Sequence, residues 1–164
     1  MNKIIFFELN EVPLKVFVYY RKLRPNSWIA SNYPKFKKYE TTTENKGHLS
    51  PWNTWPTLHR GVPSDKHYVS DFNQNLSEVD KEYPPIWDIL SSNGIKTGVF
   101  GSLHSQAVPL SNKKYDFFVP DVFAPNHECF PQDVEFFQKI NLNLSRKSGR
   151  NIDNSLPYSE ILNG

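Results

Sequence analysis

The chain has 164 residues, of which 38% are hydrophobic and 15% are aromatic, enough apolar material for the core of one ordinary domain. Its 19 Lys and Arg residues and 17 Asp and Glu residues leave a net charge of +2 without a basic block, so we expect no nucleic-acid partner. A single cysteine excludes an intrachain disulfide, and the apolar run near the N-terminus is too short to span a bilayer. We therefore expect a cytoplasmic protein without a membrane span.

The first predicted elements are a strand and a helix. Residues 4–7, with the sequence Ile-Ile-Phe-Phe, form an unbroken apolar run that is typical of a parallel strand covered on both faces. The polar residues Glu8 and Asn10 follow, and Asn10 is suited to cap a helix over 14–21, in which Leu14, Phe17, Val18 and Arg21 recur at helical spacing. A second strand is predicted at 39–43, where Tyr and Thr favour extended backbone.

A clearer α/β pattern follows in the middle of the chain. Residues 86–90 place apolar side chains on one helical face, Asn-Gly at 93–94 ends that helix, and 95–100 has the composition of a strand. A further strand is predicted at 115–119 and a further helix at 134–144. Helix, glycine and strand in this order are the parts of a parallel crossover, so we predict an α/β fold with a mostly parallel sheet flanked by helices.

The chain turns polar after residue 144. We therefore predict one α/β domain over residues 1–144, followed by a polar C-terminal segment over 145–164.

The most informative segment for function is residues 49–61. Thr54 followed by Pro56 has the composition of a helix N-cap with proline in the first turn, which would put a hydroxyl beside free N–H groups and the positive end of the helix dipole. An anionic phosphate or sulfate would bind there, next to a possible nucleophile. The alternative interpretation is a capped helix that only packs Trp52 and Trp55 into the core.

The motifs around this segment resemble a known family. Thr-Trp-Pro at 54–56, Arg-Gly-Val-Pro at 60–63 and Lys-His at 66–67 are similar to the segment around the covalent nucleophile in the alkaline phosphatase superfamily. The nucleotide pyrophosphatase/phosphodiesterase-like and sulfatase-like branches are the most similar. The order of elements over residues 3–110 is also similar. The resemblance implies an alkaline phosphatase-like core, of which this chain carries the N-terminal part.

The resemblance also implies a mechanism. The protein would be a hydrolase or transferase of phosphate or sulfate esters, acting on a small molecule or a glycan, with two divalent metal ions that are commonly zinc. Thr54 would be both the nucleophile and a metal ligand, and a residue after the first strand, Glu8 or Asn10, would bind a metal. Asn73 would donate to an oxygen of the substrate.

Several alternatives stay open at this point. Ser50 fits the family spacing to Gly61 better than Thr54 does, although Thr54 has the better local match. Asn10 is a weaker metal ligand than a carboxylate, so Glu8 or Glu11 could take its place. Among the histidines, His104 is the best candidate for a site because it follows the carboxyl end of a predicted strand. The second functional hypothesis is a non-catalytic binding or scaffold domain of the same fold.

Overall fold

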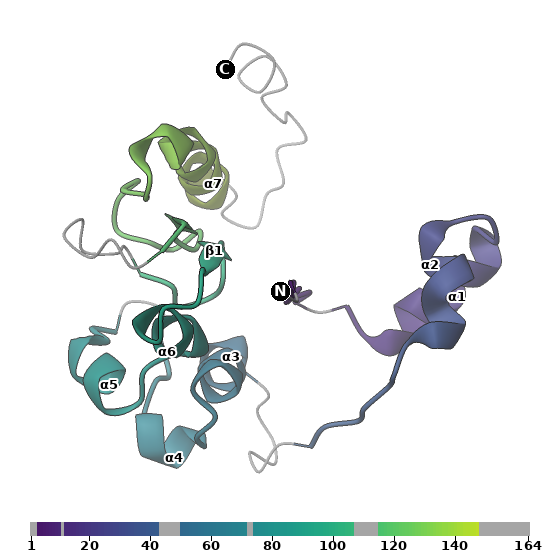
Figure 1. Cartoon of the computed structure of the whole chain (residues 1–164), viewed down its shortest axis with the longest axis horizontal. Coiled ribbons are helices and arrows are strands. Elements are labelled where there is room, and N and C mark those ends of the chain that lie inside the picture. Colours follow the sequence, from purple (N-terminus) through teal and green to yellow (C-terminus); the bar gives the residue numbers. More distant parts are fainter. Residues whose placement is uncertain (1–2, 11, 43–49, 72–73, 107–114, 148–164) are drawn as a thin grey trace. The chain divides into compact units, whose positions relative to one another are not determined.

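The computed structural model describes residues 3–10, 12–42, 50–71, 74–106 and 115–147. The chain divides into two units, Met1–His48 and Leu49–Gly164 (Figure 1). The fold is mixed α/β, with helices in both units and, within the described residues, one small parallel sheet in the second unit. None of the described helices has the length and apolar character needed to cross a bilayer.

The first unit is helical. Helix α1 spans Leu14–Leu23, helix α2 spans Trp28–Asn32, and a 3-10 turn, η1, spans Tyr33–Lys35. Ser27 caps α2, because its side chain accepts a hydrogen bond of 3.2 Å from the Ala30 N–H.

Three predictions for this unit are wrong. Residues 4–7 form no strand, and their exposed fractions lie between 64% for Phe6 and 89% for Ile4. Residues 39–42 are likewise outside any strand, whereas residue 43 lies beyond the described part. Asn10 does not cap α1, which begins after Pro13. A strand requires a partner for its backbone hydrogen bonds, and the described part of this unit offers none.

The second unit holds the sheet. Strands β1 and β2 pair in parallel, with Val99 opposite Phe118. The pairing confirms the predicted parallel arrangement, although each strand is shorter than its predicted run. In chain order the elements are α3 Pro51–Arg60, α4 Ser64–His67, α5 Ser77–Glu82, α6 Ile86–Ser92, β1 Gly98–Phe100, β2 Phe117–Val119, η2 Gln132–Val134 and α7 Glu135–Lys147.

The helices on either side of the sheet follow the sequence pattern. Helix α6 ends at Ser92 and is followed by Asn93 and Gly94; Gly94 has a φ of +73°, the left-handed conformation that glycine adopts readily. Helix α7 confirms the helix predicted at 134–144, but it continues to Lys147, into the segment predicted to be polar loop. The remainder of that segment lies outside the described residues.

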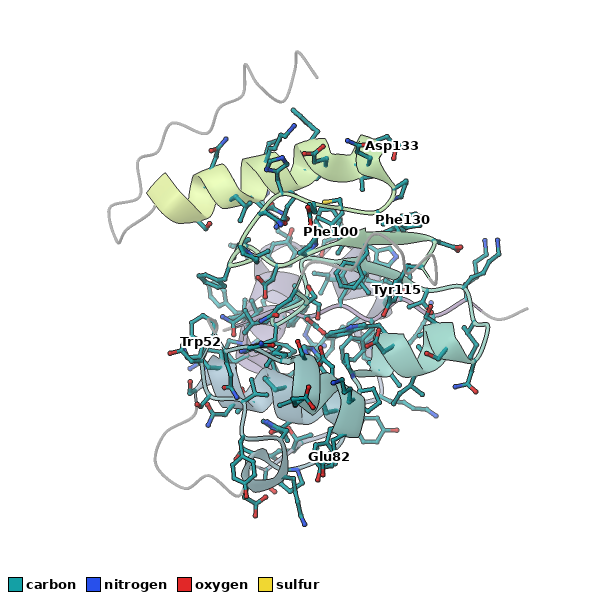
Figure 2. The ribbon with its side chains drawn as sticks, turned by 90° about the vertical axis from the view of Figure 1, so that its left-hand side faces the viewer. Trp52, Glu82, Phe100, Tyr115, Phe130 and Asp133 are labelled. Atoms are coloured by element: carbon teal, nitrogen blue, oxygen red, sulfur yellow. The ribbon has the colours of Figure 1, made fainter. Side chains whose placement is uncertain are left out.

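An apolar cluster packs α6 against the sheet. It joins Trp87 of α6 to Val99 of β1 and Phe118 of β2, with Tyr115 beside them and Phe130 packed against the group. Figure 2 labels Tyr115 and Phe130 in this region and shows α7 next to the strands, where it contacts β2.

Candidate functional site at the carboxyl ends of the strands

The N-terminus of α3 is capped by Ser50. Its Oγ accepts a hydrogen bond of 3.3 Å from the Trp52 N–H, and Pro51 occupies the first helical position. Thr54 lies one turn inside the helix, where its Oγ1 donates to the Ser50 carbonyl over 3.1 Å. The prediction that Thr54 caps the helix is therefore wrong, because the Ser-Pro signal starts the helix one turn earlier and Pro56 is accommodated inside it.

The loops after the two parallel strands are joined by Asp121. This buried carboxylate follows β2 and accepts hydrogen bonds from the His104 N–H at 2.6 Å and the Phe123 N–H at 2.8 Å. Its backbone carbonyl accepts a bond of 2.8 Å from the Gln138 side chain. Burial raises the pKa of Asp121 to about 6, against the opposing effect of these N–H groups. Asp121 thus links both loops to α7.

His104, in the loop after β1, is a buried polar residue. Only 5% of its surface is exposed. Its φ of +64° is unusual for a residue with a side chain. Burial lowers its pKa to about 4, a shift that a hydrogen bond with the Asp71 backbone opposes and the charges of His59, Arg60 and His67 reinforce. His104 is therefore neutral near pH 7.

Trp52, in the first turn of α3, packs close to His104. Its ring lies 6.0 Å from the His104 ring, edge to face, and 5.1 Å from the ring of Phe123 (Trp52 is labelled in Figure 2). The first turn of α3 therefore lies beside the loops that leave β1 and β2. In open α/β sheets this edge, beyond the carboxyl ends of the strands, is where ligands bind.

The other end of α3 has a structural role. His67 Nδ1 accepts from the Val69 N–H at 2.9 Å, so in the neutral ring the proton sits on Nε2 and is donated to Thr57 Oγ1 at 2.9 Å. Thr57 in turn donates to the Asn53 carbonyl at 2.9 Å. Burial, followed by the charge of Arg60, lowers the pKa of His67. His67 thus cannot act as a base toward Thr57, and the pair joins α3 to α4.

Arg60 also forms contacts that stabilise the fold. Its guanidinium forms an ion pair of 2.7 Å with Asp80 and donates to the Tyr83 carbonyl, and only 2% of its side chain is exposed. Burial raises the pKa of Asp80, and the hydrogen bond and charge of Arg60 oppose that shift. These contacts hold α3 against α5, so Arg60 does not face a ligand at the other end of the helix.

The residues predicted to form the site are distributed over the chain. Glu8 and Asn10 belong to the first unit, whereas Thr54 belongs to the second. Asn73 and Glu11 lie outside the described residues. Within the described ranges no three His, Cys, Asp or Glu side chains converge, so these residues alone do not fit a divalent metal ion. Sequence reasoning did not single out Asp121, although it lies only two residues beyond a predicted strand.

Comparison with known proteins identified no relative of this chain. No family model, curated protein or solved structure matches this chain. The alkaline phosphatase-like core therefore stays a prediction that rests on the sequence motifs.

Proposed function

We propose that this chain carries part of a hydrolase or transferase of phosphate or sulfate esters, and that the anionic group binds at the N-terminus of α3. The observation that supports it best is the 6.0 Å contact between Trp52, in the first turn of α3, and His104, after β1. Helix N-termini attract anions, and carboxyl ends of parallel strands collect ligands. Both rules identify the same place in this fold.

The geometry favours Ser50 over Thr54 as the nucleophile. The Ser50 hydroxyl lies at the helix end, where the positive dipole stabilises a developing alkoxide. The Thr54 hydroxyl lies a turn further along and donates its proton to the Ser50 carbonyl. Thr54 remains the second candidate because it has the Thr-x-Pro match to the family motif.

The proposed reaction is a displacement at phosphorus or sulfur. The hydroxyl oxygen forms a bond to the phosphorus of a diester, the bond to the departing alcohol breaks, and that alcohol leaves with the proton. Water then attacks the covalent ester, which releases the monoester and restores the hydroxyl. Glu8 and Asn10 remain the ligand candidates that the resemblance implies for a metal ion. Since the described residues do not fit such an ion, no step here depends on it.

The test is hydrolysis of bis(4-nitrophenyl) phosphate by the full chain, with and without added Zn²⁺. We expect turnover in the wild type, loss to the background rate in Ser50→Ala, and retention in Thr54→Ala. Thr41→Ala, an exposed threonine of the first unit, is the control for a hydroxyl removed elsewhere. Loss in Thr54→Ala with retention in Ser50→Ala would reassign the nucleophile to Thr54.

A second candidate function is an anion-binding domain without catalysis. The observation that favours it is that no metal-binding group forms among the described residues. Phosphate binding without turnover in any metal condition would support this function over the enzyme.

A further inference from the structure

Helix α1 of the first unit has an uncovered apolar face. Four large side chains lie on it at the i, i+3, i+4, i+7 spacing of one helical face: Val16, Tyr19, Tyr20 and Leu23. Their exposed fractions lie between 41% for Tyr20 and 67% for Tyr19. Neighbouring exposed apolar side chains with polar groups beside them mark surfaces that bind another protein or a membrane.

The opposite side of α1 holds the unit together. The guanidinium carbon of Arg21 lies 4.3 Å from the centre of the buried Tyr33 ring, and the Lys38 ammonium lies 4.4 Å from the same centre. Helix α1 also contacts α2, and both are labelled in Figure 1. At 3.6 residues per turn, Arg21 lies roughly 150° around the helix from the middle of the apolar face. The contacts inside the unit therefore leave that face uncovered.

The charge of the chain is divided unequally between the two units. Residues 1–48 carry nine Lys and Arg against four Asp and Glu, a formal charge of +5, whereas residues 49–164 carry ten against 13, a formal charge of −3. Lys15 and Lys22 are exposed beside the apolar face of α1. Neither lysine forms an ion pair among the described residues. The apolar face thus belongs to a basic unit and has basic groups next to it.

Apolar and basic side chains on one surface suit a membrane that contains anionic lipid. Tyrosine rings and aliphatic side chains enter the boundary between head groups and acyl chains, while lysine ammonium groups stay at the level of the head groups. Attraction between the lysines and anionic head groups adds to the apolar contact. We propose that the apolar face of α1 docks on a bilayer surface that contains anionic phospholipid.

The docking is peripheral. Helix α1 has 10 residues, about half of what a membrane-spanning helix needs, so it would lie on the bilayer rather than cross it. The inference concerns the first unit and does not rest on the proposed reaction, which is assigned to the second.

The experiment measures co-sedimentation of the full chain with lipid vesicles. One set of vesicles is phosphatidylcholine alone, and the other is a mixture of phosphatidylcholine and phosphatidylserine. We expect binding to the mixed vesicles and much weaker binding to the neutral ones. The binding should also weaken as the NaCl concentration is raised, because salt screens the attraction between the basic unit and the head groups.

The first double variant tests the apolar contact. Tyr19→Gln with Leu23→Gln should reduce binding to the mixed vesicles below detection, because the residues that enter the bilayer are replaced by polar ones. Glutamine has a favourable helix propensity, so α1 should still form, and circular dichroism checks this. The matched control is Ile86→Gln with Ile89→Gln, which changes two exposed apolar residues of α6 and should leave binding unchanged.

The second double variant tests the electrostatic attraction. Lys15→Gln with Lys22→Gln should weaken binding to the mixed vesicles by about 30-fold, about fivefold for each lysine. Lys81→Gln with Lys96→Gln, which removes two exposed lysines of the second unit, should bind like the wild type.

Three results would overturn the proposal. The first is equal binding of the wild type to neutral and mixed vesicles, and the second is equal weakening by the α1 variants and their controls. The third is no binding of the wild type to either kind of vesicle. If sedimentation velocity then shows a dimer that Tyr19→Gln with Leu23→Gln converts to a monomer, the apolar face binds a second copy of the chain instead of a membrane.

Discussion

The two units differ sharply in how they use their apolar residues. In the described part of the first unit Tyr33 alone is buried, helix α1 buries no residue, and Phe7 is 78% exposed. The second unit buries apolar residues from a helix and both strands in one cluster, together with polar groups such as His104 and Asp121. Apolar composition thus produces a core only where elements present facing surfaces. Stability and the candidate site should both depend on the second unit.

The largest expected difference is between Phe118→Ala and Phe7→Ala. Phe118 is 3% exposed in the central cluster, so its truncation leaves a cavity and should lower the free energy of unfolding by about 3–5 kcal/mol. The same substitution at Phe7 should change it by less than about 0.5 kcal/mol. Urea denaturation of both variants measures the difference. Similar losses would mean that residues 4–7 are covered in solution, and the contrast between the units would fail.

The second prediction concerns the stability of the protein as the pH falls. Burial lowers the pKa of His104 from 6.5 to about 4, so its contribution to stability is lost as the pH falls through that range. Burial raises the pKa of Asp121 from 3.8 to about 6, so its contribution is gained as the pH falls. Each effect is roughly 3 kcal/mol, and the two oppose each other in the wild type.

The His104→Asn variant removes the contribution of His104 to this pH dependence and leaves that of Asp121. Between pH 6.5 and pH 4 the variant should lose roughly 3 kcal/mol less stability than the wild type. Denaturant titrations at the two pH values give these differences. An identical pH dependence in His104→Asn and the wild type would show that His104 takes up its proton in the folded chain as easily as in the unfolded one.

The smallest expected effect compares two threonines. Thr57→Val removes the acceptor of the buried His67 Nε2–H and should lower the free energy of unfolding by about 1–3 kcal/mol. Thr41→Val, at an exposed position of the first unit, should have almost no effect. Thermal unfolding of the pair measures this difference. A neutral Thr57→Val would mean that water replaces the lost bond, and that the joint between α3 and α4 is open to solvent.

Local signals were sufficient for part of the fold. The helical face at 86–90 with Asn-Gly at 93–94 predicts α6 and its end, because spacing and the left-handed glycine act within a few residues. Residues 4–7 carry an equally strong strand signal but form no strand among the described elements. A helix makes its backbone hydrogen bonds within its own segment, whereas a strand needs a second strand, often distant in sequence, as its hydrogen-bond partner.

The residues of the candidate site were likewise predicted only in part from the sequence. Spacing favoured Ser50 as an alternative to Thr54, and the cap geometry is that of Ser50. His104 could be singled out because it follows a predicted strand. Asp121 was missed, because one carboxylate among 17 acidic residues gives no local sign that it will bind the N–H of a residue 17 positions away.

The sequence by itself determined α6, most of α7, and the two short strands with their parallel pairing, because periodicity, caps and glycines act over short distances. Only the tertiary structure decided that His104 is buried, that Asp121 holds its backbone, and that His67 and Arg60 stabilise the fold. Burial and hydrogen bonding at these residues depend on which segments meet in space, and that depends on the whole core rather than on neighbours in the chain.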